Sequence, residues 1–263
     1  MKENNDLLFG FHSIYEALKA DKRKFYKIFI SKKRSLKRLE KIESLAEKRK
    51  ITVEFVAPEI LDKMGGNTDQ QSKQQLKQQF KHQGIVAKTS FYPVRNASEI
   101  AVLLQKREKP CFILIMENIE DPHNLGALIR TALCAGVDYI LIPKNRCSGP
   151  SSTVSRSSAG AMEHAAIFMI TNTASILRTL KEHNVWVSGL DAKGDQSLFN
   201  SDLKGNIALV IGGEHKGIRP GVKKECDFLL FIPNHGPAQG NINSLNASVA
   251  GGVAMYEALR QRA

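Results

Sequence analysis

A polar segment suited to phosphate and hydroxyl chemistry follows an apolar run at residues 111–116. It reads ENIEDPHNLGALIRTA over residues 117–132 and contains the candidate site residues Asn124 and Arg130. Apolar residues at helical spacing predict a helix from about residue 125, with Asn124 placed to cap it. Arg130 lies off the apolar face, and helical side chains lean toward the N-terminus. Arg130 can therefore reach the edge of a neighbouring sheet, although an ordinary surface arginine shows the same spacing.

A second polar segment, GGEHKGIRPG at residues 212–221, follows the apolar run 207–211. Gly212 and Gly213 permit a close backbone approach, and Glu214 is the candidate functional carboxylate. The segment matches neither the dinucleotide-binding fingerprint nor the P-loop, which argues against a dehydrogenase-like enzyme. Taken alone, Glu214 could equally be a carboxylate that caps a helix.

A third polar segment occupies residues 232–248, ends in SLNAS and precedes an apolar helix. Ser244 and Asn246 are its candidate hydrogen-bonding residues. Both are also ordinary N-cap residues, so a purely structural role is the alternative interpretation.

The elements around these segments predict an α/β fold with a mostly parallel sheet covered by helices on both faces. Apolar strand-like runs alternate with helical stretches from residue 110 onward. The predicted strands are 111–116, 138–142, 166–170, 185–189, 207–211 and 229–232. The predicted helices are 125–135, 154–163, 173–183 and 247–260. In open sheets of this kind ligands bind at the carboxyl ends of the strands, where all three polar segments begin.

Residues 1–90 read as a separate, smaller α/β domain. They predict helices at 13–20, capped by Ser13, and at 35–50, with strands at 26–30, 53–56 and 85–88. A Gln-rich stretch at 67–81 is expected to be a loop. Residues 91–109 form a candidate linker with a helix at 97–106, and residues 110–263 form the second domain.

The net charge of +12 is concentrated in the first domain. Residues 1–90 hold 20 Lys and Arg against 11 Asp and Glu, a net of +9, whereas the remainder has a net of +3. Such a surplus favours a polyanionic partner, because each neutralised phosphate releases counterions. A solvated basic surface is the alternative.

Several classes of protein are disfavoured. No apolar run approaches the roughly 20 residues of a membrane helix, and residues 1–6 (MKENND) lack an apolar signal core. The four cysteines have neither Cys-x-x-Cys nor zinc-finger spacing, so we expect small packing residues and no structural metal. These features fit a reducing, cytoplasmic environment.

Taken together, the three polar segments resemble the SpoU (TrmH-like) family of RNA 2′-O-ribose methyltransferases. DPHNLG at 121–126 with Arg130 resembles its first motif, IGGEHKG at 211–217 its second, and Ile232-Pro233 with SLNAS at 244–248 its third. RSSAGAMEH at 156–164 resembles the middle segment of the family. The N-terminal stretches FGFHSIYEAL at 9–18 and HQGIVA at 82–87 resemble the L30e-like substrate domain that precedes many of these enzymes.

The resemblance implies a SPOUT-type sheet with a trefoil knot, a homodimer, and S-adenosylmethionine as the methyl donor. It assigns donor binding to residues of the second and third motifs: Gly212, Gly213, Ile232 and Leu245. The loop before Ser244 is longer than the family usually shows, and the stretch 67–81 looks like an insertion.

The resemblance also assigns the chemistry. Arg130 is central, and because a guanidinium stays protonated we expect it to orient a phosphate and stabilise alkoxide charge rather than act as a base. Asn124 would position Arg130 or the ribose, and Glu214 would hold the pocket loop or Arg130. Ser244 and Asn246 would hydrogen-bond the substrate and shape the donor site.

The separate basic domain predicts a large structured RNA as the substrate. By resemblance to the RlmB-like branch of the family, we expect a guanosine of 23S rRNA. A tRNA 2′-O-methyltransferase and a non-catalytic RNA-binding protein on the same scaffold are the alternatives. Intact Asn124, Arg130, Glu214, Ser244 and Asn246 argue against the last of these.

Overall fold

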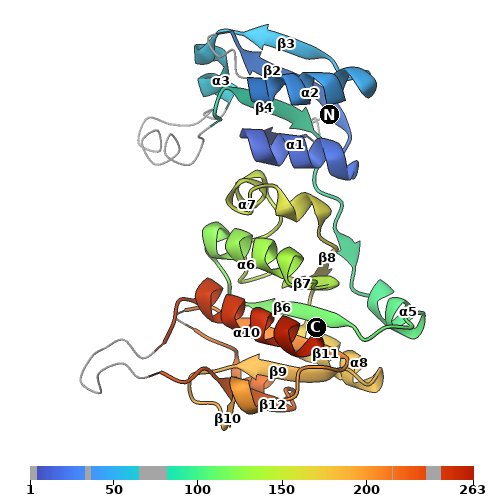
Figure 1. The fold of residues 1–263 in the computed structure, drawn as a ribbon, viewed down its shortest axis with the longest axis vertical. Coiled ribbons are helices and arrows are strands. Elements are labelled where there is room, and N and C mark those ends of the chain that lie inside the picture. The colour runs from blue at the N-terminus through green and yellow to red at the C-terminus, as the bar shows by residue number, and fades with distance from the viewer. Residues whose placement is uncertain (1–4, 33–36, 65–81, 215, 235–243) are drawn as a thin grey trace. The chain divides into compact units, whose positions relative to one another are not determined.

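The computed structural model describes all residues except 1–4, 33–36, 65–81, 215 and 235–243. The chain divides into two compact units (Figure 1). Unit 1 comprises Met1–Pro93 together with Pro150–His164, and unit 2 comprises Val94–Gly149 together with Ala165–Ala263.

Unit 1 is built on a four-stranded sheet with the strand order β1-β4-β2-β3. Strand β4 runs antiparallel to β1 and β2, while β2 and β3 are parallel. The elements are β1 (Asp6–Phe9), α1 (Phe11–Ala20), β2 (Phe25–Ser31), α2 (Lys37–Lys48), β3 (Val53–Val56), α3 (Pro58–Met64) and β4 (Ile85–Thr89). Two of them, β1 and α3, were not predicted from the sequence. The predicted loop 67–81 lies within a stretch outside the described residues.

One face of this sheet carries the main core of unit 1. Helices α1 and α2 cover this face because each presents an apolar stripe, such as Ile14 and Leu18 in α1. Strand residues such as Ile28 and Ile30 meet the stripes, and both are at most 1% exposed. Leu61 of α3 belongs to a second buried cluster that includes Phe9 and Val86.

The segment 150–164 completes unit 1. It contains the short helix α7 (Ser152–Ser157) and the 3₁₀ helix η1 (Ala161–His164). The predicted helix 154–163 is interrupted because Ala159 and Gly160 adopt left-handed conformations, with φ of 52° and 83°. Gly160 packs so closely on α1 that a Cβ there would lie 2.6 Å from the carbonyl oxygen of His12.

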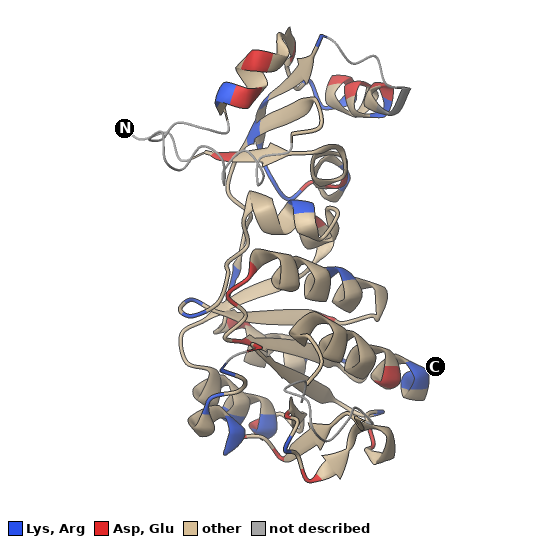
Figure 2. Ribbon diagram, turned by 90° about the vertical axis from the view of Figure 1, so that its left-hand side faces the viewer, with Lys and Arg blue, Asp and Glu red and all other residues tan. Residues whose placement is uncertain are grey.

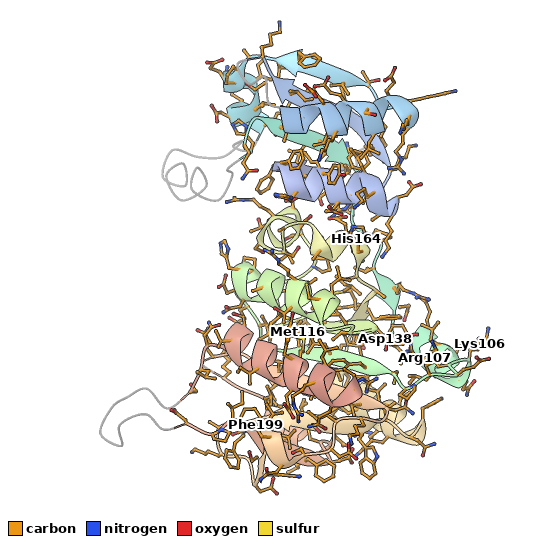
Figure 3. All side chains as sticks on the ribbon, in the orientation of Figure 1. Lys106, Arg107, Met116, Asp138, His164 and Phe199 are labelled. Carbon is orange, nitrogen blue, oxygen red and sulfur yellow. The ribbon has the colours of Figure 1, made fainter. Side chains whose placement is uncertain are left out.

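A buried ion pair fixes this segment within unit 1. The guanidinium of Arg23 donates to both carboxylate oxygens of Glu163, at 2.8 and 3.1 Å, and neither side chain is exposed. Ser155 donates to the same carboxylate at 2.7 Å, and Asp6 accepts a further bond from Arg23. His164, labelled in Figure 3, lies 2.8 Å from a carboxylate oxygen of Glu16. The sequence-based boundary at residue 110 assigns all of 150–164 to the second domain, whereas these contacts group it with the first.

Unit 2 is an eight-stranded sheet in which every pairing is parallel, with the order β10-β12-β9-β11-β6-β7-β8-β5. The strands are β5 (Arg95–Asn96), β6 (Phe112–Glu117), β7 (Tyr139–Pro143), β8 (Ile167–Ile170), β9 (Trp186–Leu190), β10 (Gln196–Ser197), β11 (Ile207–Gly212) and β12 (Phe228–Phe231). The six predicted strands lie within one residue of β6, β7, β8, β9, β11 and β12 at each end. Strand β5 joins the edge of the sheet, so the predicted linker 91–109 contributes to unit 2.

Helices cover both faces of this sheet (Figure 1). The helices are α5 (Glu99–Gln105), α6 (Pro122–Cys134), α8 (Thr173–Glu182), α9 (Pro220–Lys223) and α10 (Ala247–Arg262). On one face, α5, α8 and α9 bury residues such as Ile100, Leu177 and Val222 against the strands. On the other face α6 and α10 lie side by side, where Gly251 leaves room for the side chain of Leu128. The predicted parallel α/β architecture is confirmed.

The two ends of the strands in this sheet carry different features. At the amino edge, Asp138 accepts from the backbone N–H of Phe112 at 2.8 Å and pairs with Arg107 at 3.0 Å (Figure 3). These contacts join the start of β6 to the residue before β7. At the carboxyl edge, β6 and β11 are neighbours although the chain forms four other strands of the sheet between them, so the strand order reverses here. Such a switch point is where open α/β sheets bind ligands.

Two predicted helix caps differ in the structure. Asp121, rather than Asn124, caps α6, because its carboxylate accepts from the backbone N–H of His123 at 2.9 Å and Pro122 opens the first turn. Helix α1 begins two residues before Ser13, whose hydroxyl is buried without a hydrogen-bond partner.

The four cysteines are free thiols. Burial raises the pKa of Cys147 and Cys226 to about 12, so both stay protonated at neutral pH. Cys134 is exposed, so the expectation that all four are packing residues fails for it. Among the described helices, none combines the length and apolar character needed to cross a bilayer.

We predict that Arg23→Ala strongly destabilises unit 1. The substitution leaves the buried carboxylate of Glu163 without its cationic partner, which typically costs about 3–5 kcal/mol. Lys27→Ala is the matched control, because Lys27 pairs with Glu54 on the surface of the same unit. Urea unfolding followed by circular dichroism measures both. Equal midpoints for the two variants would contradict the structural role of the Arg23–Glu163 pair.

Candidate functional site

A hollow of about 210 Å³ lies at the carboxyl edge of the unit 2 sheet, beside the ends of β6 and β11. Its walls come from two loops, the one after β6 and the one after β11, together with the starts of α6 and α10. The lining residues are Asn118, Ile119, Glu120, Asp121, Asn124, Gly213, Glu214, Lys216 and Ala247. The three polar segments singled out in the sequence therefore meet at this hollow.

The first wall is the turn between β6 and α6. Asn118 adopts a left-handed conformation with φ of 57°, which Asn tolerates better than most residues. Its side-chain amide donates to the carbonyl of Gly217 at 2.9 Å and so ties this turn to the second wall. The capping of α6 by Asp121 then places Asn124 in the first helical turn, where it faces the hollow.

The second wall is the glycine-rich turn after β11. A Cβ at Gly213 would collide with the carbonyl oxygen of Asn118, and one at Gly212 would lie 2.5 Å from the carbonyl carbon of Gly217. Only glycine therefore permits this close approach of the two loops. A bridge between Gly213 and Gly217 closes the turn, and Glu214 projects from it.

One hydrogen-bonded cluster joins the three segments. The amide of Asn124 donates to Glu214 Oε1 at 3.1 Å, and the amide of Asn246 donates both to that oxygen and to Asn124 Oδ1, the latter at 3.2 Å. Asn246 also caps α10, since its Oδ1 accepts from the backbone N–H groups of Ser248 and Val249 at 2.9 and 3.3 Å. We call these three residues, Asn124, Glu214 and Asn246, the amide–carboxylate triad.

The other predicted site residues lie outside the triad. Arg130 is exposed on α6 and makes no hydrogen bond or ion pair with the described residues. Ser244 and Leu245 are exposed immediately before the cap of α10, and Ile232 is half-buried just after β12. Gly213 lines the hollow, whereas Gly212, Ile232 and Leu245 do not. The longer loop before Ser244 lies outside the described residues.

Several residues at the hollow were not singled out from the sequence. Asn118 binds the opposite wall, and Lys216 pairs with Glu120 at 3.0 Å on the rim. An Asn that directly follows a buried strand is a local signal for the left-handed turn at 118. The Lys216–Glu120 pair spans 96 residues of sequence, so no local pattern indicates it.

The chemistry of the walls suits a cationic organic ligand more than a metal or a phosphate. Carboxylates from Glu120, Asp121 and Glu214 outnumber the single cation Lys216 among the lining residues. A sulfonium such as that of S-adenosylmethionine fits this balance and needs no phosphate cradle. Within the described residues, no three His, Cys, Asp or Glu side chains are grouped so that they could hold a metal ion.

Comparisons with known proteins agree with this arrangement. Residues 111–256 match the model of the SpoU rRNA Methylase family, and residues 7–72 match the model described as RNA 2′-O ribose methyltransferase substrate binding. The first match covers more than half of the chain and includes the whole triad.

Relatives match along the full length. The chain is 36% identical over 262 residues to the TrmH family protein YacO of Bacillus subtilis, covering 100% of this chain and 98% of that protein. It is 34% identical over 262 residues to the 23S rRNA (guanosine-2′-O-)-methyltransferase RlmB of Xanthomonas campestris, covering 100% and 99%.

A solved structure shows the same fold. The SpoU methyltransferase AviRb of Streptomyces viridochromogenes superposes with a TM-score of 0.75 at 21% identity, covering 98% of this chain and 91% of that chain. With the motifs gathered at one sheet edge and both family models matched in order, the chain belongs to the SpoU rRNA methylase family.

Proposed function

We propose that the protein transfers a methyl group from S-adenosylmethionine to the ribose 2′-hydroxyl of a guanosine in 23S rRNA. The observation that carries this proposal is the amide–carboxylate triad, which joins all three family motifs at the switch point of the sheet. Relatives such as RlmB of Xanthomonas campestris, which bear this activity in their names, support the choice of substrate. The protein would act where ribosomal RNA is made and modified, in the cytoplasm.

Bound S-adenosylmethionine supplies a methyl group on a sulfonium, a good electrophile. The protein must therefore hold the ribose hydroxyl in line with that methyl and ease the loss of its proton. Glu214 and Asn246 hold the amide of Asn124, so the second N–H of that amide is pre-oriented to hydrogen-bond the ribose. The amide of Asn246 uses both of its N–H groups within the triad, so we assign Asn246 to shaping the site. We assign donor binding to Gly212, Gly213, Ile232 and Leu245, and substrate hydrogen bonding also to Ser244.

We assign to Arg130 the stabilisation of the negative charge that develops on the ribose oxygen as its proton is lost. Its guanidinium lies exposed without a partner among the described residues, so it is available to a phosphate or an alkoxide. A guanidinium remains protonated in proteins, so it stabilises charge electrostatically and does not remove the proton.

We predict that Arg130→Ala lowers kcat at least about 100-fold, as expected for loss of a group that stabilises transition-state charge. Donor affinity should change little, since we assign Arg130 to the ribose and its phosphate and not to the donor. A transfer assay with labelled S-adenosylmethionine and purified 23S rRNA, combined with calorimetry of donor binding, measures both. Near-normal turnover of the variant would remove Arg130 from the mechanism.

We assign RNA binding to residues 1–90, which carry most of the net positive charge. Figure 2 shows acidic residues interleaved with basic ones on α2 and α3, so those helices are not uniformly basic. Lys24 and Lys32 are exposed at the two ends of β2, and the ammonium of Lys24 lies 5.4 Å from the ring of the exposed Tyr26. A cation beside an exposed aromatic ring can contact both a phosphate and a base.

We predict that the double variant Lys24→Ala/Lys32→Ala weakens binding to 23S rRNA and reduces the salt dependence of log K. Each lost phosphate contact should lower the slope by about 0.7–0.9. Lys193→Ala/Lys204→Ala removes the same charge from exposed positions of unit 2 and serves as the control. Point variants are preferable to deletion of residues 1–90, which would leave Glu163 without Arg23.

The same assay compares 23S rRNA with 16S rRNA and tRNA and maps the modified nucleotide. Methylation of tRNA alone would overturn the proposed substrate. It would leave the proposed reaction in place.

We further propose that the chain forms the trefoil knot of its family and acts as a homodimer. An exposed apolar stripe on α10 supports the dimer: Val249 and Tyr256 are 51% and 52% exposed, and Val253 lies between them on the helix. Leu245, just before the helix, is 45% exposed. An apolar helix face left in water is typical of a protein–protein interface.

We predict a mass near twice 29.2 kDa by light scattering, and a shift toward the monomer in Tyr256→Glu. The charge would be buried without a partner in the dimer. Phe55→Glu is the control, because Phe55 is similarly exposed but belongs to unit 1. A wild-type monomer at micromolar concentration with full activity would defeat the dimer proposal.

A further inference from the structure

The carboxylate of Glu117 is buried at the last position of β6, where it is 1% exposed. It accepts a hydrogen bond from the hydroxyl of Thr173 at 2.8 Å and forms an ion pair with the Nε of Arg219. A buried carboxylate is costly unless it is paired and hydrogen-bonded, so these two partners are needed to keep it there.

The partners come from elements that are distant in sequence. Thr173 is the first residue of α8, and Arg219 precedes the first turn of α9. Arg219 also donates to the Thr173 hydroxyl at 3.4 Å, which closes a three-membered network. Glu117 thus ties the end of β6 to the starts of two helices.

This network lies at the base of both walls of the hollow. The first wall begins directly after Glu117, and the turn that carries Glu214 ends at Arg219. Two further hydrogen bonds join the walls: the backbone N–H of Gly213 donates to the carbonyl of Glu117 at 2.8 Å, and the side-chain amide of Asn118 donates to the carbonyl of Gly217. The separation of the two walls is therefore fixed where they leave the sheet.

We propose that Glu117, Arg219 and Thr173 form a clamp that positions the turn carrying Glu214 for methyl transfer, an inference that rests on the proposed function. None of the three lines the hollow. They act through Glu214, whose carboxylate orients Asn124 and Asn246, and are positioning residues. A displacement of about 1 Å in a positioned group can cost about 100-fold in rate.

The principal test is Arg219→Gln, with Arg178→Gln as the matched control. Arg178 also pairs with a glutamate, Glu225, but its side chain is 54% exposed on α8. We expect Arg219→Gln to lower kcat by about 10- to 100-fold with little change in KM for RNA, and the control to leave both unchanged. Assays run well below the melting temperature, with circular dichroism to confirm folding, separate turnover from stability.

Two milder variants, Thr173→Val and Arg219→Lys, test the same proposal if Arg219→Gln folds poorly. Thr173→Val keeps the shape of the side chain and removes only its hydroxyl, and we expect about a two- to tenfold loss in kcat, the worth of one hydrogen bond. Arg219→Lys retains the charge and should recover part of the turnover lost in Arg219→Gln. Folded variants with lowered melting temperatures but wild-type kcat would overturn the clamp.

Hydrogen exchange distinguishes failure of the clamp from failure of the proposed function. The amides of Gly213 and Gly217 are hydrogen-bonded in the turn, so loosening the clamp should speed their exchange in Arg219→Gln and not in Arg178→Gln. If the wild-type protein transfers no methyl group, the proposed function falls, and faster exchange still supports a clamp on this turn. Unchanged exchange at both amides would overturn the clamp whatever the activity.

Discussion

The parallel pairing of β6 with β11 is the constraint on which the site depends. It aligns Phe112 with Ile207 and Glu117 with Gly212, so two segments almost 100 residues apart leave the sheet at the same level. Every residue of β6 is buried, and β11 is buried up to Ile211, so neither strand can slip in register without exposing core side chains. This register therefore determines how far apart the two walls of the hollow begin.

Asn246 links the stability of the fold to the geometry of the site. Its oxygen caps α10 while its amide nitrogen donates to Glu214 and Asn124, so a single side chain satisfies orphan N–H groups of a helix and holds the carboxylate of Glu214. Asn246 is an N-cap, as one interpretation of the sequence had it, and it also belongs to the triad to which we assign a role in the site. A substitution there would change helix stability and site geometry together, which makes it a poor probe of either.

The sequence predicted the strands of unit 2 well because buried parallel strands appear as nearly continuous apolar runs, as in FILIME of β6. The resemblance identified the three residues of the triad as candidates, but it did not predict the hydrogen bonds between them. Glu117 shows why. In the sequence it is the first residue of a polar segment, whereas in the structure it is the last residue of β6. Its partners Thr173 and Arg219 lie 56 and 102 residues away, and no local pattern indicates them.

The predicted boundary at residue 110 differs from the division of the structure into two units for a related reason. Residues 150–164 follow β7 and resemble a segment of the catalytic domain, but Glu163 finds its partner in Arg23, 140 residues earlier. The chain therefore passes between the units three times, after residues 93, 149 and 164. Unit 1 is not a module that was simply added ahead of the enzyme, because its buried charge is balanced by a carboxylate from the enzyme's own middle segment. A chain that began after residue 93 would retain that carboxylate without the guanidinium that makes its burial tolerable.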